Sequence, residues 1–124
     1  MDNNSKKMKI LVVDDEQIVR DFLARFLALK SAVVKLAVDG LGAIEAAKQE
    51  RFDMVFLDVK MPQMNGLETF RELKKIDPAA KYIMMTGYAV DELLQKARQE
   101  GASHSINKPF DIQQISSIIE TCAF

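Results

Sequence analysis

Short apolar runs alternate along this chain with longer segments in which apolar residues recur every three or four positions. The runs lie at residues 10–13, 33–37, 53–58, 82–86 and 104–107. The first is continuous and rich in β-branched residues, as expected of a strand buried on both faces of a parallel sheet. The segments after the runs have the period of amphipathic helices. Five β/α units of this length predict an α/β domain, a parallel sheet with helices on both faces.

Two of the predicted helices have clear start signals. Asn65 can cap a helix that stops at the Asp77-Pro78 pair. Asp111 precedes the last helix, with Gln114 three residues later as a candidate capping box. The first and last helices are expected to bury apolar stripes, which comprise Ile18, Val19, Phe22, Leu23, Phe26 and Leu27 in the first and Ile112, Ile115, Ile118, Ile119 and Cys122 in the last.

Composition narrows the class of protein. The chain has 124 residues, enough for one domain with a core, and its net charge of -1 argues against a nucleic-acid binder. The single cysteine, Cys122, cannot form an internal disulfide. The apolar run after the N-terminal lysines is too short for a signal peptide, and no later segment has the length of a membrane span. We expect a cytoplasmic protein with a flexible tail at residues 1–8 and one domain over residues 9–124.

Polar side chains stand where four of the five predicted strands end. Asp14 and Asp15 follow the first strand, Asp58 ends the third, Thr86 ends the fourth, and Lys108 lies just after the fifth. Ligands of open α/β sheets bind beyond the carboxyl ends of the strands, so these groups are expected to meet at one rim. Clustered carboxylates suit Mg²⁺, which takes one or two protein carboxylates and keeps several waters. The Lys108 ammonium supplies a compensating charge.

Each of these residues also has an ordinary structural interpretation. Asp14 and Asp15 could cap the helix that begins near Glu16, where negative charge favours the helix dipole. The other three could be turn residues or a solvated lysine. Their joint placement at four separate strand ends favours a site. Glu16 is interpreted as a helix-start residue, and so is Asp39 after the second strand.

Four stretches together resemble the receiver domain of two-component response regulators. They are LVVDDE, FLDVKMPQMNG, MMTGYA and NKPF, in that family's order and spacing, and the resemblance runs from about Lys9 to the last helix. It implies a flavodoxin-like (βα)5 fold with strand order 2-1-3-4-5. It also implies a phosphoryl-accepting signalling domain that catalyses only its own phosphorylation and dephosphorylation. In the stretch KPFDI and in having no second domain, the chain most resembles small single-domain phosphorelay receivers.

The resemblance implies a role for each residue at the rim. Asp58 is the phosphoacceptor, supplied by a phosphohistidine on a histidine kinase or a histidine phosphotransfer protein. Mg²⁺, with Mn²⁺ as an alternative, is held directly by Asp15, Asp58 and the backbone carbonyl of Lys60. Asp14 reaches the metal through water. Lys108 stabilises the transferring group.

The resemblance also implies a conformational switch. Thr86 would bind a phosphoryl oxygen, and its movement would change a protein-binding surface. A cis peptide between Lys108 and Pro109 would aim the lysine into the site. Ser105 departs from the family, because many receivers carry at this position an aromatic residue that swings inward with the threonine. The aromatic half of the switch is therefore not expected here.

Two further positions are expected to set the lifetime of the phosphoryl group. Lys60 and Tyr88 lie two residues after Asp58 and Thr86, where receiver side chains flank the phosphoryl group. A long lysine and a bulky tyrosine obstruct the attacking water, which favours slow hydrolysis and a relay role.

Two alternative functions are weaker, and a third alternative, which concerns the extent of the chain, stays open. A magnesium-dependent aspartyl-phosphate hydrolase would need a second acid two residues after its nucleophile, where this chain has Lys60, and room for a cap domain. A non-phosphorylated pseudo-receiver typically loses the site acids or the lysine, and all are present. The chain could also be a receiver cut from a larger transcriptional regulator or hybrid histidine kinase. We expect a monomer or weak dimer that binds neither nucleic acid nor membrane by itself.

Overall fold

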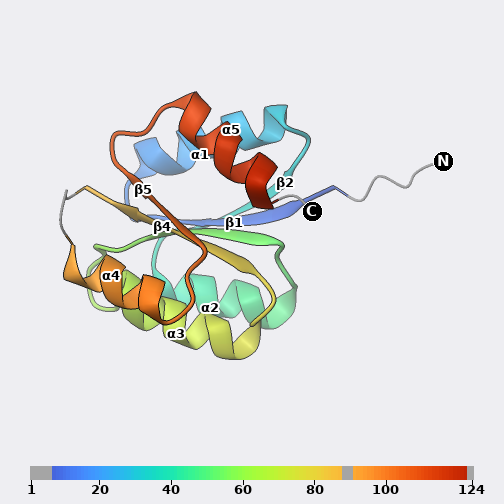
Figure 1. The fold of residues 1–124 in the computed structure, drawn as a ribbon. Helices are drawn as coiled ribbons and strands as arrows, with labels where there is room; N and C mark the ends of the chain where they lie inside the picture. Colours follow the sequence, from blue (N-terminus) through green and yellow to red (C-terminus); the bar gives the residue numbers. More distant parts are fainter. Residues whose placement is uncertain (1–6, 88–90, 123–124) are drawn as a thin grey trace.

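The computed structural model describes residues 7–87 and 91–122. One sheet of five parallel strands has the order β2-β1-β3-β4-β5, which confirms the predicted fold and strand order (Figure 1). The strands are β1 (Lys9–Val13), β2 (Val33–Ala37), β3 (Met54–Asp58), β4 (Lys81–Thr86) and β5 (His104–Asn107). The helices are α1 (Gln17–Leu29), α2 (Gly40–Gln49), α3 (Gly66–Ile76), α4 (Glu92–Gln99) and α5 (Ile112–Cys122). The predicted tail at residues 1–8 lies largely outside the described residues.

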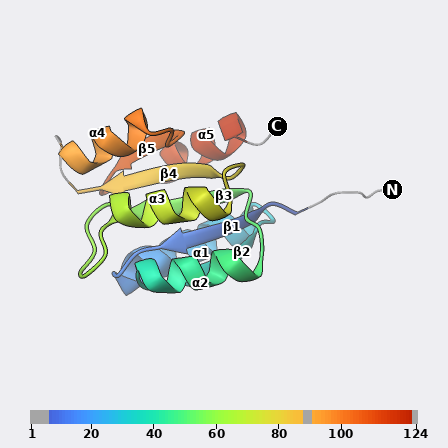
Figure 2. The same cartoon turned by 90° about the horizontal axis from the view of Figure 1, so that it is seen from below.

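The helices form two layers around the sheet. Helices α1 and α5 cover one face, and α2, α3 and α4 cover the other (Figures 1 and 2). Successive side chains of a strand point to opposite faces, so each strand contributes to two separate cores. Val55 and Leu57 of β3 pack with the α2–α4 layer, whereas Met54 and Phe56 pack with α1 and α5.

The central strand of the sheet, β3, ends at the edge where the predicted site residues lie. All five residues of β3 are buried, and the strand pairs with β1 on one side and β4 on the other. Its last residue is Asp58, which is only 4% exposed. A carboxylate at this position is desolvated by the fold itself, because the hydrophobic strand that ends in it must be buried.

The predicted helix starts at Asn65 and Asp111 are confirmed. The Asn65 side chain accepts from the Glu68 backbone N–H and the Glu68 side chain accepts from the Asn65 N–H, both at 2.9 Å. Asp111 and Gln114 exchange the same pair of bonds, also at 2.9 Å. Each box satisfies N–H groups that the first turn of a helix leaves without partners.

Three residues of the predicted apolar stripes are exposed, so the prediction was wrong at these positions. Ile18 is 81% exposed, Ile112 is 52% exposed and Phe22 is 37% exposed. Ile18 and Ile112 lie in the first turns of their helices, on the side of the carboxyl ends of the strands. Phe22 lies one turn further along α1, where its ring packs against Phe110. Among the described residues, no helix combines the length and apolar character needed to cross a membrane.

Candidate functional site

Three carboxylates meet at the carboxyl ends of β1 and β3. Val13 pairs with Leu57, so the residues that follow them, Asp14 and Asp58, stand at the same level on neighbouring strands. Asp14 is fully buried, whereas the adjacent Asp15 is exposed. One oxygen from each of the three acids lies within 4.8 Å of the others. The structure therefore brings together the acids that the strand-end pattern singled out.

Lys108 joins this cluster from the end of β5. Its ammonium lies 2.7 Å from Oδ2 of Asp14 and 3.3 Å from Oδ1 of Asp58, and its side chain is 16% exposed. It also donates to Oε1 of Glu16 at 3.1 Å. The peptide bond between Lys108 and Pro109 is cis. One cation is thus shared among three carboxylates.

The protonation of the cluster reflects this crowding. The pKa of Asp58 is raised to about 7, mainly by burial and also by the negative charges of Asp14 and Asp15, against the lowering effect of Lys108. Burial also raises the pKa of the Asp14 carboxyl. Burial opposes the Lys108 charge, but the contact with Asp14 and the charge of Asp58 raise the lysine pKa overall. The site carries more negative charge than Lys108 neutralises, which favours binding of a proton or a cation.

The oxygen atoms of the cluster fit a hard divalent cation. Oδ2 of Asp14 is buried, and the Lys108 ammonium lies 2.7 Å from it as an ion pair. A carboxylate oxygen can accept from more than one partner, so this atom can also face a cation or one of its waters. Clustered carboxylate oxygens are the ligands that Mg²⁺ and similar cations prefer. Lys60, whose carbonyl was expected to contribute, lies two residues after Asp58 with its side chain exposed.

The turn between β1 and α1 is held by its own polar contacts. Oδ1 of Asp14 accepts from the Glu16 N–H at 2.9 Å, and the Arg20 guanidinium donates to the Asp14 carbonyl at 2.7 Å. The N-cap residue of α1 is Glu16, without a side-chain capping bond, so the capping interpretation of Asp14 and Asp15 is not supported. Glu16 is a helix-start residue as predicted, but its contact with Lys108 was missed.

Thr86 lies at the end of β4, one residue beyond Met85, which pairs with Asp58. It is 2% exposed, and its hydroxyl donates to Oδ2 of Asp91 at 2.8 Å. Sequence reasoning missed Asp91, although an aspartate just before a helical segment is a typical N-cap signal. Ser105 is half-buried, and its hydroxyl accepts from Arg98 of α4 at 3.3 Å. Tyr88, expected to flank the site, lies outside the described residues.

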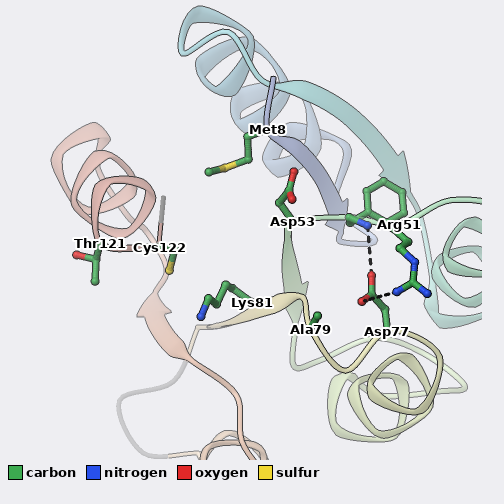
Figure 3. Close-up of a pocket in the computed structure, with 9 residues that line it drawn as sticks. Met8, Arg51, Asp53, Asp77, Ala79, Lys81, Thr121 and Cys122 are labelled. Carbon is green, nitrogen blue, oxygen red and sulfur yellow. Dashed lines mark hydrogen bonds and ion pairs between the residues drawn. The ribbon is translucent and has the colours of Figure 1, made fainter. Parts of the chain in front are cut away.

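A separate cavity of about 470 Å³ lies at the opposite, amino ends of the strands (Figure 3). Met8, Asp53 and Lys81 line it, each at or just before the start of a strand. The Asp77 carboxylate in its wall pairs with Arg51 at 3.7 Å and accepts from the Phe52 N–H at 3.3 Å (Figure 3). These polar groups stabilise the fold at that end and take no part in the carboxylate rim.

Known proteins resemble this chain over most of its length. Residues 10–120 match the family model for the response regulator receiver domain. Sporulation initiation phosphotransferase F of Bacillus subtilis is 35% identical over 112 residues, which cover 90% of each chain. Chemotaxis protein CheY of Halobacterium salinarum is 32% identical over 111 residues, which cover 90% of this chain and 92% of that protein. The structure of chemotaxis protein CheY4 of Vibrio cholerae superposes with a TM-score of 0.87 at 27% identity, covering 94% of this chain and 99% of that one.

Proposed function

This chain belongs to the family of response regulator receiver domains, and from that premise we propose that Asp58 is the residue that carries the phosphoryl group. Receiver domains are signalling domains of two-component systems, and they are phosphorylated on an aspartate. This is the function of the present chain. The alternative of a magnesium-dependent aspartyl-phosphate hydrolase is therefore set aside. One observation carries the choice of Asp58. It is a buried carboxylate at the end of the central strand, 3.3 Å from the Lys108 ammonium. Asp14 is tied to the Glu16 N–H and to Lys108 at 2.7 Å, and Asp15 is exposed.

The chemistry is a direct phosphoryl transfer. An oxygen of the Asp58 carboxylate attacks the phosphorus of a phosphohistidine on the partner, and the P–N bond breaks as the new P–O bond forms. The imidazole leaves with the electron pair of that bond and takes up a proton from solvent. Such transfers depend on in-line positioning and on neutralising the phosphoryl oxygens more than on proton chemistry. Lys108 supplies positive charge beside Asp58, and the Thr86 hydroxyl donates to a phosphoryl oxygen after transfer.

The same cluster supplies the metal ligands. We assign Asp15, Asp58 and the Lys60 carbonyl as direct ligands of Mg²⁺ or Mn²⁺, with Asp14 acting through water. Bound there, the cation supplies positive charge to the carboxylates and to the transferring oxygens. Two features of the chain support this assignment. They are the raised pKa of Asp58 and the clustering of one oxygen from each of the three acids within 4.8 Å.

An apolar surface beside the site fits the approach of a partner protein. Ile18 and Phe22 are 81% and 37% exposed, and the Phe22 ring packs against Phe110 at 5.9 Å between centroids. These residues line one groove together with Lys108 and Glu16, so the surface is continuous with the phosphoryl site. A histidine kinase or phosphotransfer protein seated there would bring its phosphohistidine to Asp58. Exposed apolar patches of this kind mark protein-binding surfaces.

The phosphorylated protein is proposed to act as a cytoplasmic relay, monomeric or weakly dimeric, that signals by a changed protein-binding surface. Lys60, exposed two residues after Asp58, supports a slow loss of the phosphoryl group. Tyr88 is assigned the same role from its place in the sequence. The chain's own chemistry is then limited to gaining and losing this group.

The test is phosphorylation by a small phosphodonor. The protein is incubated with acetyl phosphate and Mg²⁺, and the intact mass is measured. One phosphoryl adduct is expected on the wild type and on the control Asp21→Asn, which removes an exposed aspartate of α1. No adduct is expected on Asp58→Asn or in the presence of EDTA. An unmodified wild type, or an undiminished adduct on Asp58→Asn, would overturn the proposal.

A further inference from the structure

A single buried carboxylate links the end of β4 to the first turn of α4. Asp91 is 8% exposed and is the N-cap residue of α4. Its Oδ1 accepts from the N–H groups of Leu93 at 3.0 Å and Leu94 at 3.2 Å. Its Oδ2 accepts from the hydroxyl of Thr86 at 2.8 Å. One oxygen therefore holds the helix and the other holds the threonine.

The hydroxyl of Thr86 has one proton and can donate to one acceptor at a time. In the proposed function it donates to a phosphoryl oxygen on Asp58, so it has to leave Asp91 first. Oδ2 of Asp91, which is almost fully buried, then loses the hydrogen bond that it accepted from the Thr86 hydroxyl. A charged acceptor left in that state is costly, and the first turn of α4 relieves the cost by exposing it to water.

We propose that Asp91 is a positioning residue that engages the Thr86 hydroxyl in the unphosphorylated protein, so that phosphorylation of Asp58 releases the first turn of α4. The inference deepens the proposed function and rests on it. It also explains how the switch can work with Ser105 in place of an aromatic residue. The signal would reach α4 through Asp91 at the N-cap of that helix, so no aromatic side chain on β5 is required.

A second polar contact on α4 has a smaller role. Arg98, near the other end of the helix, donates to Ser105 at 3.3 Å, but this contact is exposed. Hydrogen bonds on the surface compete with water, whereas the contact between Thr86 and Asp91 is buried on both sides. The N-terminal end of α4 is therefore the end whose position depends on Thr86.

The experiment measures binding of beryllium fluoride, an analogue of the phosphoryl group, in the presence of Mg²⁺. Asparagine caps helices as well as aspartate does, but its amide has one acceptor oxygen and a nitrogen that only donates. With the oxygen bound to the helix, Asp91→Asn therefore cannot accept the proton of the Thr86 hydroxyl, and the cap is retained. Beryllium fluoride is expected to bind this variant more tightly, by roughly tenfold, the scale of one hydrogen bond to a charged group. Glu92→Gln is the matched control, since it removes an equal charge from the next, exposed residue.

Two further measurements separate positioning from a purely structural role. In a Thr86→Val background, Asp91→Asn is expected to leave the affinity for beryllium fluoride unchanged. In the wild type, amide exchange at Leu93 and Leu94 is expected to speed up when beryllium fluoride binds. If Asp91→Asn does not fold, Asp91→Ser replaces it, because serine also caps but is too short to reach Thr86.

The outcomes are distinct. Equal affinity in the wild type and Asp91→Asn, or the same gain in the Thr86→Val background, refutes the role of Asp91 and leaves the phosphoacceptor assignment standing. A matching gain in Glu92→Gln also refutes it, since charge alone would then explain the effect. Failure of beryllium fluoride to bind any variant refutes the proposed function itself.

Discussion

Replacing Asp58 by asparagine is expected to stabilise the metal-free protein at neutral pH. Burial and the nearby Asp14 raise the pKa of Asp58 from 3.8 to about 7. The folded protein therefore holds this proton more tightly than the unfolded chain does. Between those two pKa values, stability falls as the pH rises, and the full cost is present above pH 7. The difference corresponds to about 4 kcal/mol for the ionised carboxylate, which is only 4% exposed.

This cost is already net of the 3.3 Å contact between Asp58 and Lys108, which lowers the pKa. Asparagine has the shape of the neutral carboxyl and no charge to desolvate. We therefore expect a gain of up to about 4 kcal/mol in the free energy of unfolding above pH 7, and a smaller gain at about pH 5. Mg²⁺ should narrow the difference, because a cation bound to the folded wild type stabilises it by mass action.

The assay is urea unfolding followed by far-UV circular dichroism in EDTA, since the chain has no tryptophan. Asp21→Asn controls for the loss of one negative charge at an exposed position. Unchanged stability of Asp58→Asn above pH 7 would refute the reasoning. So would a gain of equal size at both pH values, because the effect would then not follow the titration of Asp58.

Three other substitutions test separate parts of the account. Gly66→Ala should destabilise the fold by about 2 kcal/mol or more, because the new methyl group meets the Asp58 carbonyl and lies 2.6 Å from a backbone atom of Val59. The midpoint of urea unfolding measures this loss. The control Gly87→Ala should be nearly neutral, because a methyl group at that position meets no atom within 4 Å. Asp15→Asn should weaken Mg²⁺ binding at least about tenfold in calorimetry while leaving metal-free stability unchanged, and unaltered binding would exclude Asp15 as a ligand. Asn65→Ala should cost about 1 kcal/mol in thermal or urea unfolding, because it removes the bond that the Asn65 side chain accepts from the Glu68 N–H and leaves only the bond from the Asn65 backbone N–H to Glu68. Asn65→Ser should recover most of the loss.

The parallel topology explains why so much of the site could be predicted. Once the alternation of strands and helices fixes a parallel sheet, every residue at a strand's carboxyl end must lie on one rim. Asp14, Asp58 and Lys108 are far apart in the chain but meet for this reason alone. The caps at Asn65 and Asp111 were also predictable, because both partners of each bond lie within one turn of helix.

The contacts that were missed depend on side chains whose partners a local pattern does not reveal. Glu16 reaches Lys108 across 92 positions of sequence, and helical periodicity carries no information about that contact. Asp91 signals a helix start, but nothing local indicates that its second oxygen accepts from Thr86. Ile18 fits an apolar stripe by its spacing, yet it projects beyond the sheet, and the position of the sheet's edge is a tertiary property.

The central claim is tested most directly by locating the phosphoryl group on the chain. The protein is phosphorylated with acetyl phosphate and Mg²⁺, the aspartyl phosphate is reduced with borohydride to homoserine, and the converted residue is identified by tandem mass spectrometry. We predict conversion at Asp58, and its loss when Mg²⁺ is removed. Conversion at Asp14 or Asp15 in place of Asp58, or equal conversion without Mg²⁺, would contradict the account.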